Sequence, residues 1–228
     1  MAANGASRII GVLILVQMVG GGLVNFVFEA PLFGAPGFLV NAAPHALQIA
    51  LGALLGLAIG ALSTGIAITA FPIFRQYSQA MALWFVALAV VGLTLSAVES
   101  MNVMSMLSLS EAYGKGGAAD REHFEALRGV AASARNWAHY IHLMLEGSTF
   151  FVMYAVLYRF ALIPRALAAF GLVAVVLQIA AVAMPLFGQG IVFLMLAPLG
   201  VSQLLLAVWL IAKGFRTQAN PGDRRKVP

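Results

Sequence analysis

Six long apolar segments, separated by turns and loops, are the feature that most limits how this chain can fold. Each is long enough to supply the roughly 20 residues that a helix needs to cross about 30 Å of hydrocarbon. They run over residues 9–28, 46–71, 80–107, 136–158, 165–184 and 191–212. The sequence therefore predicts an all-α polytopic bundle of six transmembrane helices. We expect one membrane domain over residues 1–216 and a disordered cytoplasmic tail over residues 217–228.

The composition agrees with lipid as the solvent of these segments, because only 9% of the residues are charged and 62% are hydrophobic. About a quarter of the residues of a soluble domain are charged. The absence of cysteine excludes disulfides, thiolate metal sites and cysteine nucleophiles. The chain also lacks a Walker A motif, a Rossmann fingerprint and a GxSxG motif, so it shows no nucleotide or flavin signature.

The basic residues predict the orientation of the helices in the membrane. With the N-terminus inside, the inner side receives Arg8, Arg75, Arg159, Arg165, Lys213, Arg216, Arg224, Arg225 and Lys226. The outer side receives only Lys115, Arg121, Arg128 and Arg135, all in one long loop. This asymmetry follows the positive-inside rule and places both termini in the cytoplasm. Because the basic residues lie at the segment ends and form no patch, no nucleic-acid partner is expected.

Three local patterns add detail to the bundle. Gly52, Gly56 and Gly60 form a GxxxGxxxG stripe, which favours close packing against another helix. Residues 120–135 have apolar positions at helical spacing, so we expect a short amphipathic helix on the membrane surface, in the outer loop between helices 3 and 4. Residues 30–45 contain three prolines and are expected to form a loop, and Pro198 is expected to kink the sixth helix.

An ionisable cluster marks the fourth apolar segment. His139, His142 and Glu146 lie at i, i+3 and i+7, so they share one face of a helix. The predicted topology places Glu99 of the third helix and His45, at the start of the second, in the same outer half of the membrane. Ionisable groups inside a membrane are costly and mark functional sites by default. We therefore predict a polar pocket that opens to the outer side.

The residues leave three interpretations of this pocket open. The first is a transition-metal site with His139 and His142 as ligands and His45 as a further candidate, since imidazole and carboxylate bind such metals. The second is metal-free acid–base catalysis on a lipid-like or small apolar substrate, with Glu99 and Glu146 as the acid–base pair. The third is non-catalytic: the cluster pairs helices 3 and 4 of a structural or partner subunit, or belongs to a small-molecule transporter.

The preferred hypothesis is a membrane-embedded enzyme, metal-assisted or acid–base, with membrane lipids and an apolar small molecule as its partners. No signal in the sequence indicates an oligomeric state. The first apolar segment of the chain, residues 9–28, is long, and no small-x-small cleavage site of a signal peptide follows it. We therefore expect it to be an uncleaved transmembrane helix.

Three segments of the chain, RIIGVLILVQMVGG, VMYAVLYRFALIPRALAAFGL and LLLAVWLIAKGF, carry a family resemblance. With the length and the hydropathy of the chain, they resemble the bacterial membrane family DUF4386 over nearly the whole sequence. The most specific element is Leu-Tyr-Arg at residues 157–159 followed by Ile-Pro-Arg at residues 163–165. The resemblance implies a multi-pass protein of the bacterial cytoplasmic (inner) membrane. Because the family has no known function, it implies no activity.

The sequence departs from the family pattern in two places. Phe160 and Ala161 stand where Ser-Gly is common, and Ser96 stands where an arginine often precedes the glutamate of the third helix. Without that arginine, Glu99 is expected to pair with His139 or His142.

Overall fold

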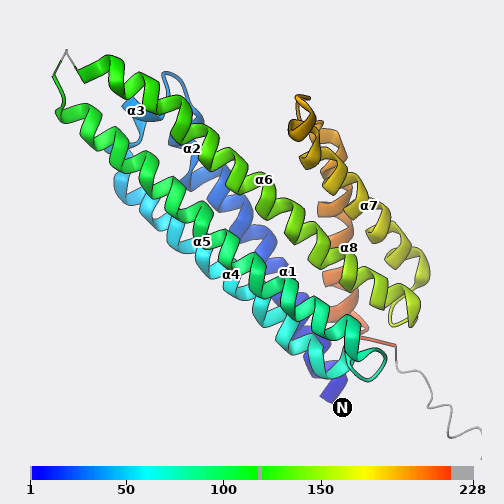
Figure 1. Cartoon of the computed structure of the whole chain (residues 1–228). Helices are drawn as coiled ribbons and strands as arrows, with labels where there is room; N and C mark the ends of the chain where they lie inside the picture. The colour runs from blue at the N-terminus through cyan, green and yellow to red at the C-terminus, as the bar shows by residue number, and fades with distance from the viewer. Residues whose placement is uncertain (1, 118–119, 217–228) are drawn as a thin grey trace, which may run out of the picture.

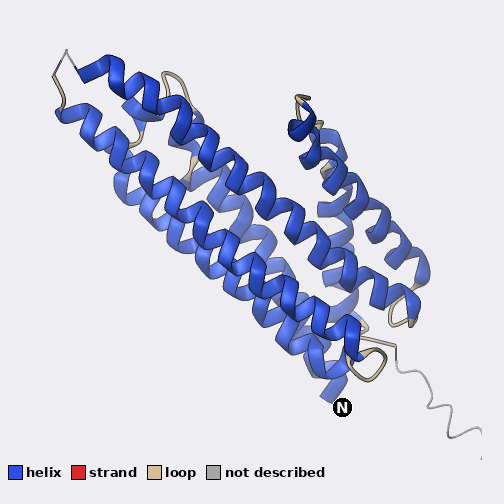
Figure 2. Ribbon diagram, viewed as in Figure 1, coloured by secondary structure: helices blue, strands red, loops and turns tan. Residues whose placement is uncertain are grey.

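The computed structural model describes residues 2–117 and 120–216, and within them the chain is helical with no strand (Figure 2). Six helices in this part are long and apolar enough to cross a membrane. They are α1 (Ala2–Leu23, continued by a π-helical turn Val24–Phe28), α4 (Ala46–Phe74), α5 (Gln79–Lys115), α6 (Arg121–Arg159), α7 (Arg165–Ala183) and α8 (Ala197–Ala212). The predicted six-helix architecture is therefore confirmed. The tail predicted to be disordered, residues 217–228, lies outside the described residues.

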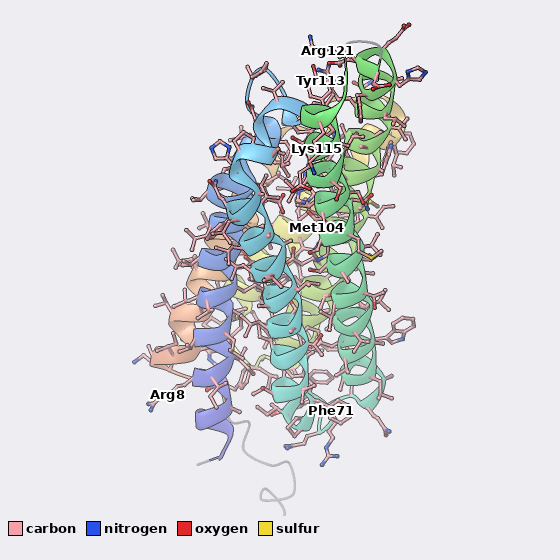
Figure 3. The ribbon with its side chains drawn as sticks, turned by 90° about the vertical axis from the view of Figure 1, so that its left-hand side faces the viewer. Arg8, Phe71, Met104, Tyr113, Lys115 and Arg121 are labelled. Atoms are coloured by element: carbon pink, nitrogen blue, oxygen red, sulfur yellow. The ribbon has the colours of Figure 1, made fainter. Side chains whose placement is uncertain are left out.

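The helices form an up-and-down bundle in which neighbours in sequence pack together and α1 closes the bundle against α4 and α8 (Figure 1). Arg8 and Phe71 lie at one end, and Tyr113, Lys115 and Arg121 lie at the other, which we call the far end (Figure 3). Large apolar side chains such as Val19 and Trp84 are exposed around the bundle. Their exposure agrees with a surface that is covered by lipid.

The two longest helices correct the prediction for the outer loop. At 1.5 Å per residue, α5 and α6 are each more than about 55 Å long, so their far-end turns extend beyond a hydrocarbon layer of about 30 Å. The amphipathic helix expected over residues 120–135 is the first part of α6 and is not a separate element. No proline interrupts residues 121–159, so the backbone stays helical where the side chains turn from polar to apolar.

Two further expectations were wrong. Residues 30–45 form the short helices α2 (Ala30–Phe33) and α3 (Phe38–Asn41) and a 3-10 turn at Ala43–His45, rather than a loop. This segment is held to α5 because the Ser110 hydroxyl donates to the Leu39 carbonyl over 2.9 Å and accepts from the Ala43 N–H over 2.9 Å. Pro198 lies in the first turn of α8, where a missing N–H costs no hydrogen bond, so it does not kink the helix interior.

The glycine stripe of α4 lies against two neighbouring elements. A Cβ added at Gly52 would lie 2.7 Å from the Cβ of Phe28, and one added at Gly60 would lie 3.0 Å from the Cβ of Ser96. The Ser96 hydroxyl of α5 donates to the Gly56 carbonyl over 3.0 Å. The absence of side chains along this stripe lets α5 and the end of α1 approach α4 closely.

Two apolar cores occupy the two ends of the bundle. The larger core lies near the end where the chain begins and includes Phe74, Phe85 and Tyr154. The smaller core lies near the far end and includes Phe38 and Val103. On α5, Glu99 lies between Ala89 of the larger core and Val103 of the smaller, and on α6, Glu146 lies between Ala132, which packs against the smaller core, and Phe150 of the larger.

Candidate functional site

A buried arginine, Arg135 of α6, joins three elements of the far half of the bundle. Its Nη2 donates to Glu29 over 2.7 Å and to Glu99 of α5 over 3.3 Å. Its guanidinium also stacks on the Phe33 ring, 4.7 Å from the ring centroid. Arg135 is only 4% exposed and Glu29 only 3%. Burial raises the pKa of the Glu29 carboxyl above its ordinary value, and the charge of Arg135 opposes that rise.

Two histidines of α6, about one and two turns after Arg135, contact the Glu99 carboxylate. The Nδ1 of His139 lies 2.7 Å from Glu99 Oε1, and the Nδ1 of His142 lies 2.8 Å from Oε2. An ionised carboxylate only accepts hydrogen bonds, so both Nδ1 atoms carry the proton. In the neutral imidazole this leaves Nε2 with a free lone pair. In the described part of the chain, neither Nε2 atom has a hydrogen-bond partner.

Glu146 of α6 lies another turn deeper and is held by a glutamine. The Gln17 Nε2 of α1 donates to Glu146 Oε1 over 3.0 Å and to the Ser63 hydroxyl of α4 over 2.7 Å. Because the carboxylate can only accept, the side-chain amide must present its nitrogen to Glu146. The Gln17 Oε1 is buried and has no partner. No salt bridge to Glu146 is formed by the described residues.

These groups surround a cavity of about 120 Å³ between α1, α4, α5 and α6. Glu99, His139, His142, Glu146 and Gln17 all line it. A smaller hollow of about 30 Å³ continues from His142 and Glu146 toward Phe85 and Met153 of the larger core. Since one water takes about 30 Å³ of liquid volume, the cavity has room for a few waters or for one small polar group.

The structure therefore brings together four of the five residues that the sequence singled out as catalytic or metal-binding. Glu99, His139, His142 and Glu146 converge on the cavity, whereas His45 is exposed at the start of α4 and its Nδ1 contacts the Asn41 carbonyl over 2.8 Å. No group of three or more histidine, aspartate or glutamate side chains within the described residues is arranged to hold a metal ion. The metal site stays a prediction.

Glu146 lies deeper than the predicted topology placed it. Its partner, Gln17, is near the middle of α1 rather than at its outer end. The polar side chains between the two cores, which we call the polar layer, therefore reach the centre of the bundle. They are Gln17, Glu29, Glu99, Arg135, His139, His142 and Glu146. From the sequence, Arg135 was expected in an outer loop, and neither Gln17 nor Ser63 was expected in the cluster. One signal was available: Arg135, His139, His142 and Glu146 follow the spacing i, i+4, i+7 and i+11, which is one helix face.

The fold and the site define a multi-pass, membrane-type helical protein with a buried Glu/His/Arg cluster. Residues 9–214 match the family model described as "Domain of unknown function (DUF4386)". This match covers most of the chain, which therefore belongs to that family. Among curated proteins and among solved structures, no match to the chain is found.

Proposed function

We propose that the chain is a membrane-embedded enzyme that carries out acid–base chemistry on a lipid-like molecule. One observation carries the proposal: the His142 imidazole is fixed by Glu99 through Nδ1, while the same side chain and Glu146 line one cavity. A carboxylate that holds one imidazole nitrogen fixes the tautomer and leaves the other nitrogen free to take a proton.

In this proposal the two glutamates have different roles, which their contacts support. Glu99 accepts hydrogen bonds from His139, His142 and Arg135, so it positions the imidazoles and stabilises the imidazolium that forms when one takes a proton. In the proposed reaction, His142 Nε2 removes a proton from the substrate. His142 then returns the proton to the product, and Glu146, which has one oxygen without a hydrogen bond, accepts a hydrogen bond from the reacting group and holds it in place.

The size of the cavity limits what reacts. A volume of about 120 Å³ accepts a small polar group but not a lipid chain. The reacting group would therefore enter the cavity while the apolar remainder stays among the helices or in the bilayer.

The test is turnover in a defined membrane. The purified protein is reconstituted into nanodiscs with a bacterial polar lipid extract, and the lipids are followed over time by mass spectrometry. We expect one lipid class to be converted by the wild type into a product with a new mass or, after an isomerisation, a new chromatographic retention time, and the rate to fall about 100-fold or more in Glu99→Gln and His142→Ala. Glu111→Gln, an exposed carboxylate on the same helix α5, is the matched control and keeps the rate. No lipid change beyond that in empty nanodiscs would refute the enzyme.

The metal-assisted version is tested separately, by elemental analysis of the purified protein beside a His139→Ala/His142→Ala double variant. Stoichiometric metal that the double variant loses would make the two histidines ligands, with Glu99 as the carboxylate that orients them. No metal in the wild type would leave the metal-free form of the reaction.

One observation favours a second, non-catalytic function. Arg135 bridges Glu29 and Glu99 at near-complete burial, as a residue that fixes helix positions does. In that case the chain would be a structural subunit or a transporter. Substitution of Glu146 would then lower the free energy of unfolding as much as substitution of the other residues of the cluster.

A further inference from the structure

Three hydrogen-bond acceptors around Glu146 have no donor among the described residues. Gln17 is 7% exposed and its Oε1 has no partner, although its Nε2 makes two hydrogen bonds. Glu146 Oε2 and the Nε2 atom of neutral His142 also have no hydrogen bond from the described residues. Of the three, Gln17 Oε1 is buried. A buried acceptor without a donor is costly, so a ligand that donates a hydrogen bond to it would relieve that cost.

The charges in this layer are also unbalanced. Three carboxylates, those of Glu29, Glu99 and Glu146, share the layer with one guanidinium, that of Arg135. Arg135 is paired with Glu29 and Glu99, whereas no described residue forms a salt bridge with Glu146. A ligand that fits these acceptors is therefore a cation that can donate several hydrogen bonds, which an ammonium group does.

A second hollow of about 170 Å³ reaches Glu146 and Gln17 from the side, between α1, α6 and α8. Ile14, Met18 and Phe150 form its apolar wall, and Gln203 of α8 adds one further amide. A Cβ added at Gly22, which also lines the hollow, would have no atom within 4 Å.

This hollow lies on the lipid-facing side of the bundle. Helix α8 packs tightly on α1 near the end where the chain begins, since a Cβ at Gly11 would lie 2.8 Å from the Ala207 carbonyl oxygen. The two ribbons separate toward the far end (Figure 1). Val19 of α1 and Leu204 of α8, next to the lining residues, are 64% and 47% exposed. In a bilayer, the apolar tails of lipids reach such a surface.

We propose that an amphiphile with one apolar chain and an ammonium head group enters this site from the bilayer, through the hollow between α1, α6 and α8. The ammonium donates to Glu146 and to Gln17 Oε1, and the chain lies along Ile14, Met18 and Phe150. The inference rests on the proposed function for the identity of the site and names its substrate class. Binding itself requires no turnover.

The test compares three ligands that share one chain. The detergent-solubilised protein is titrated with n-decylamine, n-decanol and n-decanoate, and binding is followed by tryptophan fluorescence and by the shift in Tm. We expect decylamine to bind at least tenfold more tightly than decanol, and decanoate not to bind. In Glu146→Gln, the affinity for decylamine falls at least tenfold and the preference over decanol is lost. Equal binding of all three ligands, tighter binding of decanol, or an unchanged Glu146→Gln would each overturn the proposal.

The entry route has its own pair of variants. Gly22→Leu puts a side chain into the hollow without entering the central cavity, and we expect it to weaken decylamine binding at least tenfold. Gly65→Leu on α4 is the matched control: its Cβ also meets no atom within 4 Å, and binding should not change. Unchanged binding in Gly22→Leu would reject this route. Decylamine binding without any lipid turnover would reject the proposed enzyme and keep the binding site.

Discussion

Two parts of the polar layer, one above the other on α6, are built differently. In the upper part, Arg135 joins Glu29 and Glu99, and the carboxylate of Glu99 is occupied by three donors. In the lower part, Glu146 has a single hydrogen bond, from Gln17, and the other oxygen of that amide has no partner.

Because of this difference, we expect the upper part to contribute mainly to the stability of the fold and the lower part mainly to ligand binding. A buried charge pair is costly to break, because the remaining charge stays in an apolar medium. A half-satisfied carboxylate beside a cavity contributes less to the fold and remains free to bind a ligand. We therefore expect substitutions in the upper part to lower the free energy of unfolding and those in the lower part to alter binding.

The largest effect is expected for Arg135→Met. The substitution leaves Glu29 buried without its cation and removes one donor from Glu99, so the free energy of unfolding should fall by about 3–5 kcal/mol. Denaturant unfolding in detergent measures it. Arg128→Met is the matched control on the same helix, because the Arg128–Glu125 pair is exposed and its loss should cost less than about 1 kcal/mol. Equal losses would mean that the buried junction does not hold the helices.

The second effect lies in the larger apolar core, outside the polar layer. A Cβ added at Gly171 of α7 would overlap the ring of Tyr154 of α6, which is fully buried. Gly171→Ala should therefore lower the free energy of unfolding by about 1–3 kcal/mol through overpacking. Gly65→Ala should instead be neutral or stabilising by up to about 1 kcal/mol, since its Cβ meets open space and alanine favours the helix. A stable Gly171→Ala would show that α6 and α7 separate easily.

The third effect is smaller and tests a hydrogen bond of Tyr154, a residue of that core. The Tyr154 hydroxyl donates to Ser202 of α8 over 3.1 Å, and the Ser202 hydroxyl donates to the Leu199 carbonyl. Tyr154→Phe removes the first bond only, so a loss of about 1 kcal/mol in the free energy of unfolding is expected. Tyr140→Phe, at a half-buried tyrosine of the same helix with no side-chain hydrogen bond among the described residues, should change it by less. Identical values for the two variants would contradict this account.

The sequence predicted the six spans because each apolar segment is bounded by polar residues, turns or prolines. It also predicted the pairing of Glu99 with the histidines, since an acid and two imidazoles at one depth of a bundle have few other partners. The prediction that Arg135 lies in an outer loop was wrong, because the change from polar to apolar side chains near this residue marks the membrane surface but does not end the helix. With residues 120–158 treated as one helix, Arg135 falls on the same face as His139.

Gln17 could not have been placed in the site from the sequence. It is one polar residue in an apolar helix, and the side chain it faces depends on how α1 packs. Helix α1 meets α4, α6 and α8 far along the chain, and the close approach at Gly11 and Gly20 sets its position. Glycine positions allow such contacts but do not name the partner helix.

The smallest effect on stability is expected where the effect on binding is greatest. Glu146→Gln keeps an oxygen that accepts from Gln17 Nε2, and it removes a charge that forms no salt bridge with a described residue. The free energy of unfolding should therefore change by less than about 1 kcal/mol, against the several kcal/mol that loss of a paired buried charge costs. The same denaturant titration measures it, with Glu99→Gln as the comparison, because Glu99 accepts from three partners and its variant should lose more. A loss in Glu146→Gln as large as that in Glu99→Gln would make the whole layer a structural joint, and it would favour the non-catalytic function over the enzyme.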